Sequence, residues 1–416
     1  MEEWKEYRLG DVITIKSGFA YKGDMIGYGE NILLGMGCVS FKERFLLSGA
    51  RAYAGDCADR YCAKSGDIVL ATRQQSDNLP ILGMPAIIPN ELSEKRIVIG
   101  ANLYRVDNES DFSNEYIYWL LKTPLYVNYI RSCQSGTTVR MITKANIEDF
   151  RFRAPDRKER DIISSFLKSL DDKIEVNRRI NDNLEQQAQT LFKSWFVDFE
   201  PFKDGELAES ELGMIPGSWS VQTANDVFEI NIGKTPPRKE HEWFSDSNED
   251  NVWVSISDMG SCGMFISDSS EYLTDEAIDR FNIIMVERNT VLLSFKLTVG
   301  RVAIADNQLT TNEAIARFIL PAEYYREFLY LYLKQYKYEN LGSTSSIATA
   351  VNSKTIKGMK LLIPPINVIS DFSKITKPLF EEIRYTLQES RRLAQLRDTL
   401  LPRLMSGELE VDDVVV

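Results

Sequence analysis

The residues that could do chemistry in this chain are a pair of aspartates and a lysine, and they fit a nuclease only incompletely. A Pro-Asp pair ends at Asp156, and Asp171 and Lys173 follow in the order of the PD…(D/E)xK arrangement, whose carboxylates and lysine hold magnesium and activate water. That chemistry needs the groups on adjacent strands, whereas Asp171 and Lys173 fall in a predicted helix, about four turns beyond Asp156. The matching positions later in the chain, Phe380 and Glu382, abandon the pattern. A single-chain metal-dependent nuclease is therefore kept only as an alternative.

Other catalytic signatures are absent from the sequence. The one histidine, His241, lies in the acidic stretch KEHEWFSDSNED, which predicts a surface loop and leaves no histidine-rich metal site. No GxxxxGK[ST] or GxGxxG nucleotide-binding motif occurs. The two PP pairs, TPPR at 235–238 and IPPI at 363–366, lack the flanking residues of the [ND]PP[YF] signature of adenine methyltransferases. We expect the chain to catalyse nothing alone and to hold no metal or cofactor.

Composition describes an ordinary globular protein of the cytoplasm. No apolar run reaches the ~18 residues of a membrane span, and the start MEEWKEYRLG lacks the features of a signal peptide. Five cysteines without a CxxC pair predict free thiols in a reducing compartment. The net charge of −12 argues against a nucleic-acid partner, but residues 240–280 carry eleven acidic side chains against one arginine. The acidic tail from Glu408 onward adds four more, so the rest of the chain is near neutral and can form a basic face.

The sequence is internally repeated. WKEYRLGDVITIKSG at 4–18 and WSVQTANDVFEINIG at 219–233 share a tryptophan, an Asp-Val pair, an isoleucine and a glycine at the same spacing. Later, NEYIYWLLK at 114–122 matches REFLYLYLK at 326–334. The apolar runs GDIVLATR and NTVLLSFK predict a buried strand in each half. The sequence therefore predicts an α+β fold with two tandem α/β domains, residues 1–155 and 217–364, related by a pseudo-twofold repeat.

Each domain is followed by a stretch that predicts a long helix, over 156–200 and 365–407. The first has no proline or glycine from Arg157 to Trp195, and apolar residues recur at steps of three and four. In the second, we expect Pro378 to introduce a kink and Pro402 to mark the end. The seam positions are Leu167, Leu170, Ile174, Asn177, Asn181, Leu184, Ala188, Leu191 and Trp195, then Phe372, Ile375, Leu379, Ile383, Leu387, Leu393, Leu400 and Leu404.

Two apolar stripes in one chain are best satisfied by pairing the helices as an antiparallel coiled coil, with the two asparagines fixing the register. The alternative is that each helix simply covers its own domain. Residues 201–216, rich in acidic residues and glycine, predict a linker, and 408–416 form an acidic tail.

Two dissimilar domains on a helical spacer suit double-stranded DNA, whose equivalent groove faces recur every ~34–36 Å. The target would be bipartite and asymmetric. In the 71–80 loop, Arg, Gln and Asn are residue types that read base edges, whereas the threonines, Arg140 and Lys144 of the 135–144 segment suit phosphate oxygens. The candidate DNA-binding residues of the first half are Arg73, Gln74, Gln75, Ser76, Asn78, Thr137, Thr138, Arg140 and Lys144. Those of the second half are Lys234, Thr235, Arg238, Lys239, Lys296, Arg301, Ser343, Thr344, Ser345, Ser346 and Lys354.

Three phrases resemble the type I restriction–modification specificity subunits. They are LFKSWFVDFEPFK at 191–203, SELGMIPGSW at 210–219 and LRDTLLPRLMSGEL at 396–409, which stand where that family carries them. The resemblance covers essentially the whole chain. It implies that each domain is a target recognition domain and that the paired helices act as a ruler between them.

The resemblance also implies the partners. Two modification subunits, which bind S-adenosylmethionine and methylate adenine N6, would dock along the helices, and restriction subunits that use ATP and magnesium would join them. The outer helix faces and the aromatic residues Phe192, Trp195, Phe196 and Phe199 are candidate docking surfaces, although these aromatics could equally be satisfied internal packing. The start PPINVISDFSKI departs from the family pattern and puts docking there in doubt. A scaffold with no DNA role is the other alternative.

Overall fold

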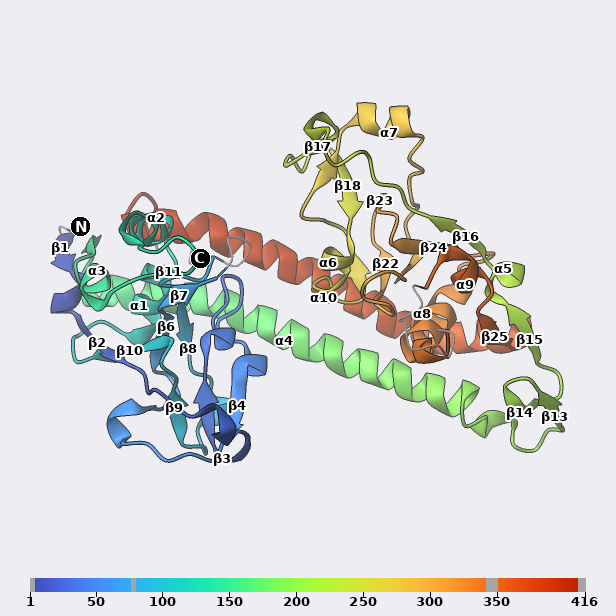
Figure 1. Cartoon of the computed structure of the whole chain (residues 1–416), viewed down its shortest axis with the longest axis horizontal. Helices are drawn as coiled ribbons and strands as arrows, with labels where there is room; N and C mark the ends of the chain where they lie inside the picture. The colour runs from blue at the N-terminus through green and yellow to red at the C-terminus, as the bar shows by residue number, and fades with distance from the viewer. Residues whose placement is uncertain (1–3, 76–79, 342–350, 411–416) are drawn as a thin grey trace. The chain divides into compact units, whose positions relative to one another are not determined.

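The computed structural model describes residues 4–75, 80–341 and 351–410. It divides into two compact units, which we call unit 1 (residues 1–175 and 390–416) and unit 2 (residues 176–389). Figure 1 labels many of the helices and strands of both units. Within the described ranges, no helix is both long and apolar enough to cross a membrane.

Unit 1 contains two four-stranded sheets and a closing pair of strands. The first sheet has the order β2-β10-β6-β8 and is antiparallel throughout, and the second has the order β4-β3-β9-β5 with a parallel β3–β9 pair. These strands are β2 (Ile13–Ser17), β3 (Ile26–Leu34), β4 (Ala50–Tyr53), β5 (Cys62–Ala63), β6 (Ile68–Ala71), β8 (Pro85–Ile87), β9 (Ile97–Ile99) and β10 (Leu103–Asn108). Strands β1 (Lys5–Arg8) and β12 (Arg151–Ala154) pair where the domain begins and ends.

In the described residues of this domain, the α-helices are α1 (Asn114–Leu120), α2 (Pro124–Cys133) and α3 (Lys144–Glu148). Helix α1 begins at Ser113, whose side chain accepts a hydrogen bond from the Tyr116 N–H, and every residue from Tyr116 to Leu120 is buried. The prediction that GDIVLATR is a buried strand is confirmed, because all four residues of β6 are buried.

Unit 2 repeats this plan. Its five-stranded sheet has the order β16-β24-β21-β22-β19, so its first four strands follow one another as β2-β10-β6-β8 do. The strands are β16 (Glu229–Ile232), β19 (Phe265–Ile266), β21 (Val291–Ser294), β22 (Val302–Ala305) and β24 (Ile315–Ile319). A second sheet holds β17 (Phe244–Ser245), β18 (Asn251–Val254), β20 (Tyr272–Leu273) and β23 (Thr310–Thr311), and β15 (Ser220–Thr223) pairs with β25 (Lys360–Ile363). The short helices are α5 (Ala224–Val227), α6 (Ile256–Met259), α7 (Asp275–Phe281), α8 (Tyr325–Gln335) and α9 (Ser353–Lys357).

The repeated opening phrase has a physical reason at its final glycine. A Cβ on Gly18 would lie 2.1 Å from the carbonyl oxygen of Gly100, and one on Gly233 would lie 2.1 Å from that of Asn312. In each unit the backbone of the neighbouring chain segment approaches too closely for any side chain. The predicted internal repeat and α+β fold are therefore confirmed, down to the position that only glycine can fill.

Residues 201–216, which we expected to be a linker, are folded. Strands β13 (Leu207–Ser210) and β14 (Gly213–Pro216) form an antiparallel hairpin after a short 3-10 helix at Glu200–Phe202. The linker therefore contains a folded hairpin.

The two long helices are α4 (Arg157–Phe196) and α10 (Ile366–Ser406). The expectation that Pro402 ends the second helix is wrong, since α10 continues to Ser406. It ends at Gly407, whose φ of +75° is left-handed, and the Glu408 N–H donates to the Arg403 carbonyl over 3.0 Å. Helix α10 also continues unbroken through Pro378.

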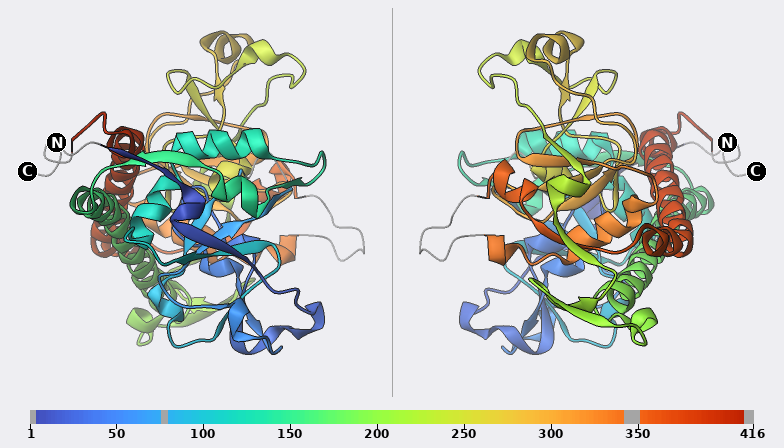
Figure 2. Two further views of the ribbon diagram at one scale, coloured as in Figure 1. Left: turned by 90° about the vertical axis from the view of Figure 1, so that its left-hand side faces the viewer. Right: turned by 90° about the vertical axis from the view of Figure 1, so that its right-hand side faces the viewer.

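Within each unit, α4 and α10 pack against each other, as Figures 1 and 2 show. In unit 1, Ile163 and Leu167 share a buried cluster with Leu400 and Leu404, and Arg397 donates to Asp171. In unit 2, the Asn177 side chain donates to Glu389 over 2.7 Å, and Thr386 donates to Asn181. As the residue number on α4 increases, the residue number of its partner on α10 decreases. The pairing is therefore antiparallel, as predicted. Both asparagines make polar contacts across the seam.

One predicted seam position of α10 is wrong. Ile375 is 48% exposed, whereas Thr376 is fully buried and Phe380 is buried with it. The buried face of α10 therefore steps from Phe372 to Thr376 and on to Phe380 and Ile383. A threonine can take the buried position because its hydroxyl donates to the Phe372 carbonyl over 2.9 Å. Periodicity alone favours the apolar Ile375, because it does not show that the Thr376 hydroxyl has a partner in its own helix.

Candidate nucleic-acid interface

In unit 1 the structure brings two of the predicted DNA-binding segments together. Strand β7 (Arg73–Gln74) pairs antiparallel with β11 (Arg140–Met141), so that Met141 lies opposite Arg73. The side chains of Arg73, Gln75, Thr137 and Thr138 are exposed. Two segments far apart in the sequence therefore present one surface, which we call the β7–β11 ribbon (residues 73–75 and 135–141).

The base of this ribbon is fixed by backbone contacts. The Thr72 hydroxyl donates to the Asn102 carbonyl over 3.0 Å, and the Ile142 N–H donates to the Thr72 carbonyl over 3.2 Å. Burial raises the pKa of Tyr104, and the nearby positive charge of Arg73 opposes that shift. The Tyr104 hydroxyl donates to the Ile142 carbonyl over 3.3 Å. The exposed side chains of the β7–β11 ribbon therefore project from a backbone that these hydrogen bonds fix in place.

Not every candidate in unit 1 faces solvent. Gln74 is 7% exposed, and its amide oxygen accepts the Leu82 N–H over 3.3 Å, so its side chain is used inside unit 1 and does not face a partner. Lys144 is half-buried, with its ammonium 5.8 Å from the ring centre of Tyr104. Arg140 is half-buried as well. Ser76 and Asn78 lie outside the described residues.

In unit 2, four candidates are engaged in internal contacts. The Lys234 ammonium donates to the carbonyls of Phe281 and Asn282, over 3.0 and 2.9 Å, and the Thr235 hydroxyl donates to Glu313. Arg301 donates to the Ile256 carbonyl. These three side chains therefore tie loops together in the described structure.

Arg238, the fourth, is engaged most completely. Its guanidinium donates to both carboxylate oxygens of Glu271 over 2.7 Å and lies 4.6 and 4.5 Å from the ring centres of Phe244 and Trp253. Reading DNA with this arginine would require these contacts to break. Lys239, Lys296 and Lys354 are exposed, and 343–346 lie outside the described residues.

The turn between β21 and β22 displays a residue that the sequence did not single out. Leu297 is 99% exposed and has a φ of +58°, between Lys296 and Thr298, which are exposed too. An apolar residue in a polar turn is a weak signal, and leucine rarely adopts left-handed backbone, so neither feature could be predicted.

The acidic stretch 240–280 uses several carboxylates internally. Asp258 accepts the Ser255 N–H over 2.8 Å at the start of α6, and Asp275 accepts the Asn251 side chain over 2.9 Å. Burial and the hydrogen bond to Asp268 raise the pKa of Tyr272 to about 12. Some of the negative charge therefore serves the fold of unit 2.

The nuclease alternative does not fit the geometry. Asp171 is 5% exposed and accepts from Arg397, with an Arg44 nitrogen 3.8 Å from its other oxygen. Asp156 instead accepts the Glu159 N–H over 3.0 Å at the start of α4. Two arginines occupy the place where a metal would have to bind. No group of three or more His, Cys, Asp or Glu side chains in the described ranges is arranged to hold one.

The aromatic residues at the end of α4 form the core of unit 2. Phe192 and Phe196 are 3% and 5% exposed, and their rings lie against Phe328 and Phe372. Phe196 also contacts Trp219, 5.7 Å between ring centres. For Phe192 and Phe196 the structure supports internal packing, whereas Trp195 and Phe199 are half-buried and docking through them stays a prediction.

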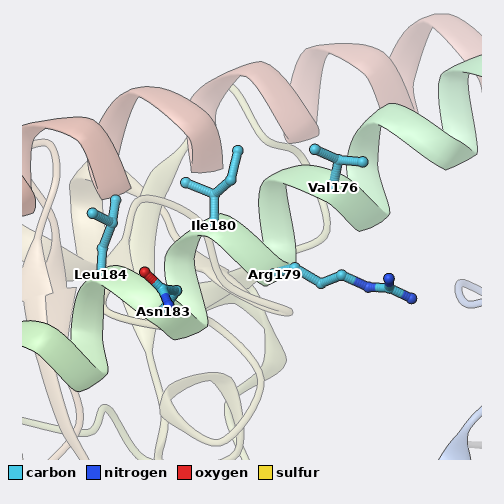
Figure 3. A pocket seen from close by; sticks show the side chains of 5 residues that line it. All are labelled: Val176, Arg179, Ile180, Asn183 and Leu184. Atoms are coloured by element: carbon cyan, nitrogen blue, oxygen red, sulfur yellow. The ribbon is translucent and has the colours of Figure 1, made fainter.

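A shallow apolar hollow lies along α4. It is lined by Val176, Arg179, Ile180, Asn183 and Leu184. Figure 3 shows Val176, Ile180 and Leu184 directed toward the ribbon of α10, whereas Arg179 extends away. Val176 is 49% exposed and Ile180 is 37% exposed, so the helix face is only partly covered.

Comparison with known families places the whole chain in one group. The family described as "Type I restriction modification DNA specificity domain" matches residues 1–186 and 216–390. The "Type I restriction enzyme HindI specificity subunit" of Haemophilus influenzae is 28% identical over 98% of this chain and 100% of its own length. The "Type I restriction enzyme MjaIX specificity subunit" of Methanocaldococcus jannaschii is 27% identical over 99% of this chain and 89% of its own.

A solved structure has a similar fold. The type I restriction–modification system S subunit from M. genitalium superimposes with a TM-score of 0.56 at 14% identity, over 97% of this chain and 96% of that one.

Proposed function

Because the chain belongs to the type I restriction modification DNA specificity family, we propose that its two heads each read one half of a bipartite, asymmetric DNA target. The heads are residues 5–154 of unit 1 and 220–363 of unit 2. The chain is the sequence-recognition subunit of such a system and is not itself catalytic. One observation carries the proposal: both heads share a strand order but carry different side chains on the matching connection, β6 to β8 and β21 to β22.

In unit 1 the proposed reading surface is the β7–β11 ribbon. Arg73 and Gln75 have the side chains that hydrogen-bond to guanine and adenine edges, and a two-stranded ribbon fits the major groove of B-form DNA. Thr137 and Thr138 are exposed beside them and suit phosphate oxygens. The 73–75 segment of the ribbon would then contact bases, and the 135–141 segment would contact phosphates.

The spacer is the pair of long helices. Helix α4 has 40 residues, which at ~1.5 Å per residue is about 60 Å long. Polar contacts from Asn177 and Asn181 to α10 penalise any slip in the pairing, since a shifted register would bury these groups without partners. We propose that this fixed register sets the number of unread base pairs between the half-sites.

The proposed partners supply the chemistry. We infer that two modification subunits, carrying S-adenosylmethionine, methylate adenine N6 at the target, and that restriction subunits using ATP and magnesium join them in the cytoplasm. The partly covered α4 face at Val176, Ile180 and Leu184 supports docking along the helices. Helix α10 is continuous from Ile366, so a broken first turn does not stand against docking there.

The experiment is DNA binding by the purified chain, alone and with its modification subunits, between about 50 and 200 mM salt. Phosphate contacts release counterions, so the logarithm of the association constant should fall linearly with the logarithm of salt concentration. Binding without salt dependence, or none at all, would support the scaffold alternative. Cleavage of a plasmid by the chain with magnesium alone would overturn the assignment in favour of a nuclease.

A further inference from the structure

The β21–β22 turn of unit 2 is built as a rigid platform. Ser294 is fully buried, and its hydroxyl donates to the Thr298 carbonyl over 2.6 Å and accepts the Arg301 N–H over 3.0 Å. The Gly300 N–H donates to the Ser294 carbonyl over 3.0 Å. Phe295 is 1% exposed, and Tyr338 packs beneath the turn, so close that a Cβ on Gly300 would lie 3.0 Å from its ring. The hydrogen bonds of Ser294 and the packing of Tyr338 therefore fix both ends of the turn.

This platform holds one apolar side chain out into solvent. Leu297 is at the tip, 99% exposed, and its side chain gains essentially no burial from the described protein. Lys296 and Thr298 on either side are exposed and polar. A cation beside an apolar tip is the composition of side chains that enter a DNA groove and separate adjacent base pairs.

The backbone at Leu297 makes incidental exposure a poor explanation. Among the described non-glycine residues, φ is positive at Phe199, Asn282, Asn289 and Leu297. Asparagine tolerates this conformation, and at Phe199 the strain is offset by packing on Trp219, 5.3 Å between ring centres. Leucine at position 297 has neither advantage in the free chain. The strained backbone at Leu297 is explained if a partner covers the leucine side chain.

We propose that Leu297 is an apolar wedge that enters the base stack at the half-site read by unit 2, with Lys296 on the adjacent phosphates. This rests on the proposed DNA-reading function and adds to it a mode of recognition. A wedge reads how easily a base step is unstacked, which selects flexible steps such as TA or CA without hydrogen bonds to bases. Unit 1 presents Arg73 and Gln75 on its matching connection, so we assign the wedge to unit 2.

The test uses the full chain assembled with its modification subunits, without S-adenosylmethionine. The probe is the duplex target, whose sequence is first read from methylated adenines in host DNA. 2-Aminopurine replaces each adenine of the target in turn, except the methylated ones, and its fluorescence rises where stacking is lost. The wild-type complex should give a rise at one step of one half-site.

Leu297→Ala should remove most of this rise in fluorescence. It should also raise the dissociation constant about tenfold or more, because the apolar leucine side chain no longer leaves water on binding. The slope of affinity against salt should not change, since Lys296 remains. Leu297→Met keeps an apolar tip and should retain the rise. Ile284→Ala is the matched control, because Ile284 is 55% exposed in the same unit and should change neither quantity.

The outcomes separate the wedge from the function on which it rests. A rise that persists in Leu297→Ala, or normal binding by the wild type with no rise at any step, would overturn the wedge and leave the proposed function standing. Loss of subunit assembly in Leu297→Ala would overturn the wedge too, because the side chain would then contact protein instead of DNA. Failure of the wild-type complex to bind DNA would overturn the proposed function and the wedge together.

Discussion

Breaking the ion pair between Asp171 of α4 and Arg397 of α10 should destabilise unit 1 more than most single substitutions do. Both side chains are nearly buried, at 5% and 9% exposure, and a nitrogen of Arg44 lies 3.8 Å from the second Asp171 oxygen. Arg44 is paired in turn with Glu115 over 2.6 Å. Asp171→Asn keeps the shape of the side chain but leaves two buried guanidinium groups short of negative charge.

Removing one partner of a buried pair costs about 3–5 kcal/mol, because the remaining charge stays desolvated. For a unit of this size each kcal/mol shifts the melting temperature by roughly 2–4 °C. The calorimetric transition of unit 1 should therefore fall by about 6–20 °C in Asp171→Asn. Circular dichroism of the helical signal would report the same loss, because α4 and α10 hold much of the helix.

The matched control is the adjacent residue. Asp172 is 55% exposed and pairs with Lys168 on the same helix, so Asp172→Asn should cost less than about 1 kcal/mol. A double variant, Asp171→Asn with Arg397→Gln, should recover some of the loss. If Asp171→Asn and Asp172→Asn have the same melting temperature, the buried pair does not hold the two helices together.

Three further predictions concern single residues. Gly18→Ala should destabilise unit 1 by about 1–3 kcal/mol or more, because the new Cβ would meet the Gly100 carbonyl at 2.1 Å, whereas Gly23→Ala, with open space around it, should change the melting temperature little. Burial lowers the pKa of Lys122 to about 8, so its charge is disfavoured in the folded state at neutral pH. Lys122→Met should therefore raise the melting temperature at neutral pH. This gain should shrink as the pH rises from about 8 to the ordinary lysine pKa. A gain that is independent of pH would show that the buried charge is not its cause. Arg73→Ala should relax base preference in one half-site of the methylation motif, and equal weakening of both half-sites would show that the β7–β11 ribbon is not a local reader.

The architecture could be predicted from the sequence because it depends on local patterns that repeat. The buried strands β6 and β21 are short apolar runs, and the long helices have apolar residues at regular steps without interruption. Asn177 and Asn181 stood out as polar positions in an apolar seam, and both contact α10. Such features need no knowledge of distant residues.

The roles of individual polar residues could not be predicted, because they depend on partners that are distant in the sequence. Gln74 has the side chain of a base reader, but its oxygen is used by the Leu82 N–H. Arg238 has the side chain of a DNA-binding residue, yet Glu271 and two aromatic rings hold it. Periodicity also cannot show that the Thr376 hydroxyl is satisfied by its own helix, so Ile375 was placed in the seam. Polar residues are assigned reliably only when their hydrogen-bond partners are known.

The central claim is that the paired helices measure the distance between two half-sites. It is tested most directly by removing one heptad from each helix, residues 174–180 and the facing 386–392, and mapping methylated adenines in cells that carry only this variant. Seven residues shorten a helix by about 10 Å, or about three base pairs of DNA. The account predicts the same two half-sites with a spacer about three base pairs shorter, and an unchanged spacer would contradict it.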